Sequence, residues 1–412
     1  MTLPDTITEI GRNAFYHCDN LTTLNLPDGI TTIGDNAFGK CSSLTSLTIP
    51  ASVTSGIESA LGLSASDGYP HASDVTFANG SPYQIVDGIL YQNTVLLKLI
   101  DRTRTEVTVK DGTTKIGDLA FGFRFETSGP VISSITLPDT VTEIGEDAFA
   151  YTDITSIDLS HVTSIGESAF SHTDLSSVNL TNVDELGESV FSYCKELKSV
   201  VWPSSMTTIP KSTFSNAGLT SFVIPDGVTS VGDNAFLKVE GLTMLSVPES
   251  VESIGSKAFM RAFADDESAY LIMQKTTPPT LGTNVVGNTK PENLKVFYPE
   301  TAEAAYKGTI LVGESEDNGY ALSLTPSTTM ALASTDAGNN TLTLSGITVP
   351  EGMTLDVTSS DEAVATAAFD DGKLTFTGMG EGTATITATL SVNGYTVLTD
   401  TCVVTVTDTA SS

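Results

Sequence analysis

Apolar and polar residues follow a block pattern that repeats along the chain. Each block contains a short run in which apolar and polar residues alternate up to a proline, as in Leu21-x-x-Leu24-x-Leu26-Pro27. Alternation with a period of two predicts a strand with one buried face. Proline ends the strand because it has no N–H group to donate. The same run recurs before Pro50, Pro138, Pro203, Pro225 and Pro248.

A second short extended segment follows each proline and leads to a glycine, as in Ile7-Thr-x-Ile10-Gly11. An alanine–phenylalanine pair comes next, and we expect it to form one short helical turn that places the ring in the core. Apart from the gap between Phe38 and Phe121, successive phenylalanines of this kind are 21 to 28 residues apart. The copies are Ala14-Phe15, Ala37-Phe38, Ala120-Phe121, Ala148-Phe149, Ala169-Phe170, Ala235-Phe236 and Ala258-Phe259, with looser ones at Val190-Phe191 and Thr213-Phe214.

One block is too small to fold alone. Its apolar side chains stabilise it by roughly 1.5–3 kcal/mol each when buried, whereas ordering the chain costs about 1–2 kcal/mol per residue. Stacked blocks share their buried faces, so an array of them becomes stable. The pattern therefore predicts a mainly β solenoid with a parallel sheet along one side.

The combined motif, L-x-x-L-x-[LI]-P followed by [IV]-x-x-[IL]-G-x-x-A-F-x-x-C, resembles the BspA-like leucine-rich repeat family over residues 1–312. The resemblance implies a leucine-rich-repeat solenoid with a parallel sheet and short helical turns. It also implies a β-hairpin insertion near 83–100, for which Asp87-Gly88 supplies a two-residue turn. A closing repeat is expected near 271–310.

The periodicity changes after residue 312. Residues 313–319 are polar and acidic and are typical of a linker. Short alternating runs separated by turn residues then predict a β-sandwich over 320–408. The segments starting at Ser359 and Gly378 make this part similar to bacterial immunoglobulin-like domains (group 2) of surface adhesins.

Charge excludes two classes of partner. The chain has 50 acidic and 19 basic residues, a formal net charge of −31. Phosphate recognition needs a surplus of Lys and Arg, so neither nucleic acid nor an anionic membrane surface is an expected partner. No apolar run reaches the roughly 18–20 residues needed to span a bilayer, so we expect no membrane insertion in this segment.

Candidate catalytic groups are few. Cys18, Cys41 and Cys194 all lie three residues after a repeat phenylalanine, a position that other copies fill with small residues. We expect buried free thiols there, although adjacent coils leave a bridge between Cys18 and Cys41 open. The four histidines, two of which share a repeat offset, lack the spacing of metal ligands, and we expect them to be solvated: they are His17, His71, His161 and His172. We expect no catalytic, cofactor or metal site, and no enzyme.

The outward positions of the predicted strands form the candidate ligand face. Residues two and four before the proline position point to solvent when those before and after them point inward. They are mainly Ser, Thr and Asn, with a small apolar patch at one end. Such a row is either a solvated strand surface or a contact surface for a protein or glycan. The positions are Thr23, Asn25, Ser46, Thr48, Ser134, Thr136, Ser156, Asp158, Ser177, Asn179, Ser199, Val201, Ser221, Val223, Met244 and Ser246.

The resemblance implies a non-catalytic, adhesin-like binding protein. The solenoid would recognise an extracellular host or bacterial protein, and the immunoglobulin-like domain would act as a spacer. The alternative is a carbohydrate-binding or scaffolding module of a cell-surface complex. We expect a monomer that is extracellular or on the cell surface. Because Leu3 already lies inside a repeat, a signal segment and an anchor would lie outside this sequence.

Overall fold

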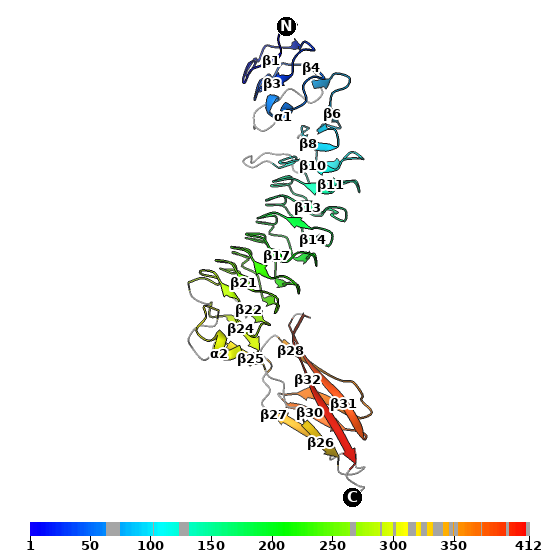
Figure 1. Cartoon of the computed structure of the whole chain (residues 1–412), viewed down its shortest axis with the longest axis vertical. Helices are drawn as coiled ribbons and strands as arrows, with labels where there is room; N and C mark the ends of the chain where they lie inside the picture. The colour runs from blue at the N-terminus through cyan, green and yellow to red at the C-terminus, as the bar shows by residue number, and fades with distance from the viewer. Residues whose placement is uncertain are drawn as a thin grey trace.

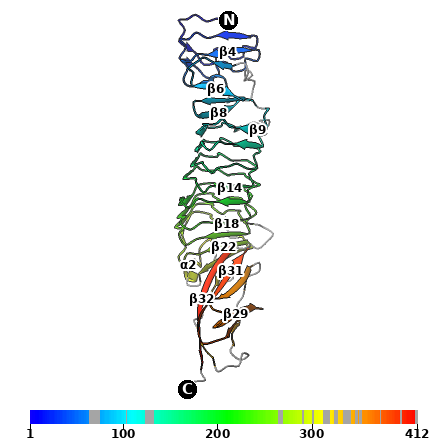
Figure 2. The same cartoon turned by 90° about the vertical axis from the view of Figure 1, so that its right-hand side faces the viewer.

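The computed structural model shows a rod of stacked coils that is followed by a two-sheet unit (Figure 1). The N-terminus lies at one end of the rod, and the C-terminus lies beyond the other end (Figure 2). The structure describes residues 1–62, 75–101, 103–122, 132–263, 269–288, 291–299, 302–311, 319–322, 328–332, 341–345, 349, 353–371, 373–392 and 395–408.

The strands at the proline positions lie side by side along the rod, and we call them layer A. Neighbouring strands are parallel and in register: Thr23 lies opposite Ser46, and Ser177 lies opposite Ser199. Layer A consists of β2 (Thr23–Asn25), β4 (Ser46–Ile49), β5 (Val75–Phe77), β9 (Glu106–Thr108), β11 (Ser134–Thr136), β14 (Ser177–Asn179), β16 (Ser199–Val201), β18 (Ser221–Val223), β20 (Met244–Val247), β22 (Ala269–Met273), β24 (Leu294–Pro299) and β25 (Gly319–Leu322).

The two-residue strands that follow each proline form a second parallel row, layer B. A glycine comes directly after most of these strands because the backbone of the preceding coil leaves no room for a side chain. A Cβ on Gly166 would lie 2.7 Å from the backbone N of Glu146. Layer B consists of β1 (Glu9–Ile10), β3 (Thr32–Ile33), β10 (Lys115–Ile116), β12 (Glu143–Ile144), β13 (Ser164–Ile165), β15 (Glu185–Leu186), β17 (Thr208–Ile209), β19 (Ser230–Val231), β21 (Ser253–Ile254) and β23 (Thr280–Leu281).

A third row of hydrogen bonds between coils runs through the turns that carry the phenylalanines. The N–H groups of Phe149 and Tyr151 donate to the carbonyl oxygens of Ala169 and Ser171 at 2.8 and 2.9 Å. The residues two before and two after the phenylalanine are left-handed, as at Asp147 (φ 50°) and Tyr151 (φ 62°). These residues end the local spiral after one turn, so the expected short helical turns are single turns rather than helices.

The phenylalanine rings stack inside the rod, as the repeat predicts, in a pair of Phe15 and Phe38 before the hairpin and in a continuous series from Phe121 to Phe259 after it. Phe149 lies between Phe121 and Phe170, with ring centroids 5.1 and 5.3 Å away and planes within 8° and 2°. These three rings are fully buried. The stack continues towards the C-terminal end of the rod, where the rings tilt, reaching 58° between Phe236 and Phe259.

The hairpin insertion lies where the sequence predicts it and joins two parts of the core. Its strands are β6 (Tyr83–Val86), β7 (Ile89–Gln92) and β8 (Val95–Leu99). Alternate residues of β7 face different clusters: Ile89 and Tyr91 belong to the long core of the rod, and Leu90 belongs to the N-terminal core. A short helix, α1 (Ile57–Ala60), takes the place of a phenylalanine turn on the N-terminal side of the hairpin, and the N–H groups of Asn36 and Phe38 donate to the carbonyl oxygens of Ser59 and Ala60 at 2.7 and 3.0 Å.

The parallel sheet extends past the predicted end of the repeats. β25 pairs with β24, so that Gly319 lies opposite Val296. The sequence predicted that Gly319 ends the linker and that residues 320–322 begin the sandwich. All four residues instead belong to the last strand of layer A. Residues 313–318 lie outside the described part of the chain. A second short helix, α2 (Glu303–Tyr306), closes the end of the rod, with Tyr306 stacked on Tyr298 at 5.1 Å.

The C-terminal unit is a β-sandwich of two sheets. The first has the order β26-β32-β31-β28 and the second β27-β30-β29. Between them lies a small core that includes Phe376, Ile386 and Val404. Its strands are β26 (Thr328–Leu332), β27 (Thr341–Ser345), β28 (Met353–Ser359), β29 (Ala365–Asp370), β30 (Lys373–Gly378), β31 (Gly382–Val392) and β32 (Tyr395–Asp408).

Candidate functional site

The outward positions of layer A lie on the surface over most of the rod. In β2, Leu24 is 1% exposed, while its neighbours Thr23 and Asn25 are exposed, and the same alternation holds in β4, β11 and β14. Ser221 is half-buried, and Ser156 and Asp158 lie in a segment without a strand. The exposed predicted positions are Thr23, Asn25, Ser46, Thr48, Ser134, Thr136, Ser156, Asp158, Ser177, Asn179, Ser199, Val201 and Val223.

Two polar residues of this face hold the corner of their own coil. Their coils lack the proline of the other repeats, and the side chains of Asp158 and Asn179 replace it. Asp158 accepts a hydrogen bond from the N–H of Ser160 at 2.9 Å, and Asn179 accepts one from the N–H of Thr181 at 3.0 Å. The hydrogen bonds from Ser160 lower the pKa of the Asp158 carboxyl below its ordinary value, so this carboxyl stays charged at neutral pH.

Two predicted positions, Met244 and Ser246, are not on the surface. Their side chains are 0% and 2% exposed. Met244 belongs to a small apolar cluster with Tyr270, Phe297 and Leu390, the last of which comes from β31 of the sandwich. The sandwich thus rests on the outer face of the last coils (Figure 1). The prediction that these two residues are open to a ligand is wrong because a later domain packs on a surface that repeat periodicity alone marks as outward.

The apolar end of the outer face therefore consists of two valines. Val201 is 49% exposed and Val223 is 38% exposed. Val223 lies opposite the covered Ser246 in the register of layer A. The open face of layer A thus ends next to the sandwich.

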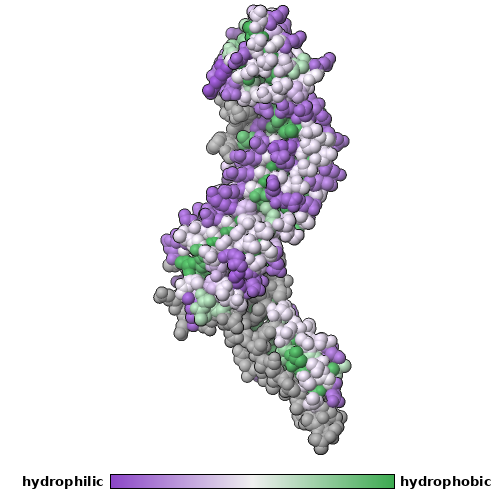
Figure 3. Space-filling model, in the orientation of Figure 1, coloured by the Kyte–Doolittle hydropathy of each residue, from purple (hydrophilic) through white to green (hydrophobic). Residues whose placement is uncertain are grey.

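Figure 3 shows the polarity of one side of the molecule. On this side, hydrophilic side chains predominate over the described part of the rod, and hydrophobic ones gather in small separate areas. Large apolar patches mark many obligate interfaces, and this side carries none over its described residues.

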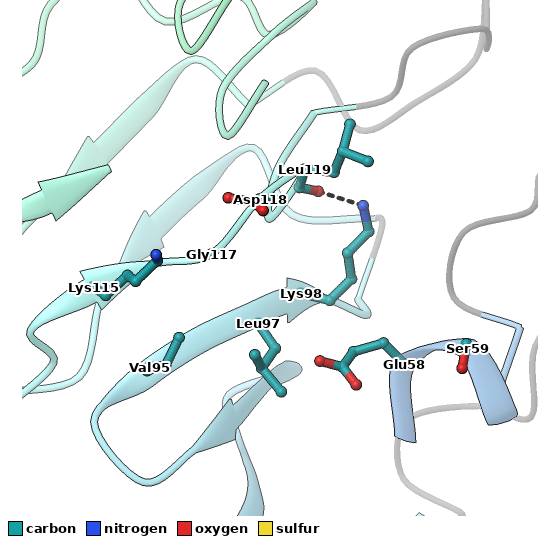
Figure 4. Close-up of a pocket in the computed structure, with 9 residues that line it drawn as sticks. All are labelled: Glu58, Ser59, Val95, Leu97, Lys98, Lys115, Gly117, Asp118 and Leu119. Carbon is teal, nitrogen blue, oxygen red and sulfur yellow. Dashed lines mark hydrogen bonds between the residues drawn. The ribbon is translucent and has the colours of Figure 1, made fainter. Parts of the chain in front are cut away.

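A pocket of about 380 Å³ lies where α1 meets β8 and the turn after β10. Figure 4 shows Glu58 reaching towards it from α1, and Lys98 crossing from β8 to the turn. The Lys98 ammonium donates hydrogen bonds to the carbonyl oxygens of Leu119 and Gly122, and Lys115 forms an ion pair with Glu143. Both lysines therefore have structural partners, and the pocket follows from the change of geometry at the insertion.

The cysteines are free thiols, Cys41 and Cys194 being buried and Cys18 partly buried. The position three residues after the repeat phenylalanine holds hydrogen-bond donors as well as small residues. Cys194 Sγ donates to the carbonyl oxygen of Phe170 at 3.0 Å, and Thr173 Oγ1 donates to the same oxygen at 2.9 Å. Burial raises the pKa of the Cys194 thiol to about 11, so it stays protonated at neutral pH.

The sequence did not lead us to predict one feature of the exposed turns that follow the repeat phenylalanines. Tyr151, His172 and Tyr193 stack ring on ring, with centroids 4.3 and 4.2 Å apart. We call these three residues the aromatic column. Each lies two residues after a repeat phenylalanine. That shared offset was the available signal, but His172 was expected to be a solvated histidine.

Over the described part of the chain, no group of three or more His, Cys, Asp or Glu residues is placed to hold a metal ion. No helix in the described ranges has the length and apolar content to cross a membrane.

Known proteins resemble the chain in sequence and fold. Six copies of the family profile described as "BspA type Leucine rich repeat region" match residues 1–65, 102–218 and 207–265. A leucine-rich repeat protein from Bacteroides ovatus is 21% identical with a TM-score of 0.47, over 78% of this chain and 76% of that one. No curated protein matches the chain.

Two further solved structures are similar to the chain. A leucine rich cell surface protein from Faecalibacterium prausnitzii is 23% identical with a TM-score of 0.32, over 63% of this chain and 84% of that one. A leucine-rich repeat protein from Eubacterium ventriosum is 16% identical with a TM-score of 0.37, over 82% and 86%.

Proposed function

The chain belongs to the BspA-type leucine-rich repeat family, and from this premise we propose that it is a non-catalytic, adhesin-like binding protein of the cell surface or the extracellular space. The outer face of layer A is its recognition surface, and the ligand is an extracellular host or bacterial protein. The C-terminal sandwich is a bacterial immunoglobulin-like domain that serves as a spacer.

One observation carries the proposal. The outward residues of β2, β4, β11, β14 and β16 are exposed, and apart from Val201 they are Ser, Thr and Asn side chains. Those on paired strands lie in register, as Thr23 and Ser46 do, and so form a row. Hydroxyl and carboxamide groups both donate and accept hydrogen bonds. Such a row can pair with backbone and polar side chains of a protein without first displacing an ion partner.

The apolar end of the face supports a protein ligand over a glycan. Val201 and Val223 are exposed on neighbouring coils. Apolar side chains at the centre of a contact become hot spots when a partner excludes water from them. A carbohydrate-binding or scaffolding role on the same face remains the competing function.

The test is binding of immobilised extracellular matrix proteins, with a glycan array in parallel. We expect Ser199→Arg combined with Val201→Arg to abolish the binding of a matrix protein that the unmodified chain retains. Thr208→Arg, an exposed position in layer B, is the matched control and should bind normally. Equal binding by both variants, or binding to glycans alone, would refute protein recognition by layer A.

A further inference from the structure

The aromatic column differs from every other part of the exposed turns. Its three rings lie nearly parallel, with interplanar angles of 13° and 7°. The two tyrosines remain open to solvent, Tyr151 being 47% and Tyr193 42% exposed, and His172 between them is half-buried. The stack thus holds two tyrosines in fixed positions on the surface.

The backbone fixes these rings in a conformation that bulky residues rarely adopt. All three residues are left-handed, with φ of 62°, 59° and 60°. Their N–H groups donate to carbonyl oxygens of the next coil at 2.9, 2.9 and 2.8 Å. This backbone conformation recurs at the same position of the other described coils, so the repeat itself holds the rings in place.

The fold itself does not require aromatic rings at this position. The other described coils accept polar and charged side chains there with the same left-handed backbone. Those residues are His17, Lys40, Asn216, Lys238 and Arg261. Among the coils whose residue at this position is described, a row of three rings is therefore specific to these.

The rows beside the column are mainly acidic. Asp153 and Asp174 are exposed and lie two residues after Tyr151 and His172, and Glu167 is exposed on the other side of the turn. Lys195 is the basic neighbour. Burial is the larger cause that lowers the pKa of His172, and the positive charge of Lys195 is the smaller one. A neutral imidazole adds no positive charge at pH 7. The chain as a whole carries a net charge of −31.

Tyrosine rings elsewhere in the chain already bind cations. The Lys40 ammonium lies 5.8 Å from the centre of the Tyr16 ring, and the Lys110 ammonium lies 5.7 Å from that of Tyr91. A guanidinium group is suited to the same contact because it stacks flat on an aromatic face and pairs with a carboxylate at the same time.

We propose that the aromatic column is a second docking site, which binds an arginine-bearing basic segment of a partner protein. The tyrosine faces and edges contact the guanidinium groups, and Asp153 and Asp174 pair with their charge. The column lies in the turns after layer B and not on the outer face of layer A. This site is therefore independent of the function proposed above.

The test uses the full chain and a fluorescently labelled hexa-arginine peptide, with hexalysine as the second probe. Tyr151→Asn with Tyr193→Asn keeps the net charge and introduces the residue that the next coil holds at the same repeat position, Asn216. We expect this variant to bind hexa-arginine about tenfold more weakly, the size of a lost cation–π and packing contact. Tyr16→Asn, the same change at an exposed tyrosine outside the column, should bind normally.

The outcomes separate site-specific binding from general attraction to an acidic protein. Unchanged hexa-arginine affinity in the double variant would overturn the proposal, and so would equal affinity of the unmodified chain for hexalysine. If the double variant does not fold, the ring proton signals of His172 provide the second measurement. Hexa-arginine should shift them and leave those of His161 in place; the absence of such a shift would also overturn the proposal. Ser199→Arg with Val201→Arg should leave this binding intact.

Discussion

The repeat phenylalanines are among the largest fully buried side chains of the described residues. Phe170 is fully buried and stacks on Phe149 at 5.3 Å and on Phe191 at 5.8 Å. Phe15 occupies the same repeat position near the N-terminus, but it is only partly buried. The same residue type therefore contributes differently according to its place in the rod.

Phe170→Ala should lower the free energy of unfolding by about 3–5 kcal/mol, as is typical when a large buried side chain leaves a cavity. Phe15→Ala should cost clearly less, because water and local movement can fill its site. The measurement is urea unfolding followed by circular dichroism. Equal losses in the two variants would contradict the burial of the inner rings.

The Cys194 thiol makes the stability of the fold depend on pH. Its folded-state pKa of about 11 lies above the ordinary value of 9.0 because burial disfavours the thiolate. A group with a raised pKa stabilises the fold fully below its unfolded pKa, and this contribution is lost as the pH rises through the folded pKa. A shift of this size corresponds to roughly 3 kcal/mol.

We expect stability to fall between about pH 9 and pH 11, and to fall less in Cys194→Thr. Threonine replaces the thiol donor with a hydroxyl donor and already fills the same repeat position at Thr173. The measurement is the urea midpoint of unfolding at each pH.

The burial of Cys194 can also be tested by thiol modification. Iodoacetamide at pH 8 should modify Cys18 faster than Cys194 in the folded chain. Fast modification of Cys194 would disprove its burial.

At the scale of elements, the hairpin insertion is the joint between two stretches of the rod. Its turn, Asp87-Gly88, has left-handed φ values of 49° and 74°. Gly88 also lies close to a neighbouring loop, so that a Cβ there would be 2.4 Å from the Cβ of Asp101. Gly88 is therefore required for two reasons, its conformation and its close contact.

Gly80 provides a matched comparison. It is left-handed as well, with φ 86°, but a Cβ at this position would have no other atom within 4 Å. Gly80→Ala should cost about 1–2 kcal/mol for the left-handed conformation alone, and Gly88→Ala should cost more. Hydrogen exchange of β6 and β7 should rise in Gly88→Ala. Similar losses at both sites would show that the contact with Asp101 does not matter.

At the scale of the whole molecule, the sandwich and the rod share an apolar contact. Met244, Tyr270, Ile272 and Phe297 point outward from the last coils and pack with Leu390 of the sandwich. Layer A therefore has an open portion and a covered portion. We therefore expect this contact to hold the sandwich in one orientation on the rod.

Met244→Ser together with Phe297→Ser should release the sandwich without disturbing the core of the rod. Serine is already present at Ser221, the register partner of Met244. Small-angle scattering should show a broader distribution of interatomic distances. Val223→Ser, on the same face outside the contact, is the control. Scattering identical to that of the unmodified chain would mean that the apolar contact does not fix the orientation.

Local periodicity was sufficient to predict the coil. Alternation before each proline, the glycine after layer B and the recurring phenylalanine each reflect a constraint within one repeat or between neighbouring repeats. For that reason the solenoid, the parallel register and the ring stack could be predicted. The hairpin at Asp87-Gly88 was expected from the resemblance to the repeat family, and the sandwich from the alternating runs that follow the repeats. The outward direction of Thr23 and Ser177 follows from the same alternation.

Contacts between distant parts of the chain could not be predicted in this way. Alternation already indicates which residues face out of a coil, because that depends on period two and on the repeat length. It does not indicate that Leu390 covers Met244, that β25 extends layer A or that Tyr151, His172 and Tyr193 meet as one column. The physical reason is that burial and stacking depend on which surfaces meet in space, and repeat spacing limits only the surfaces of adjacent coils.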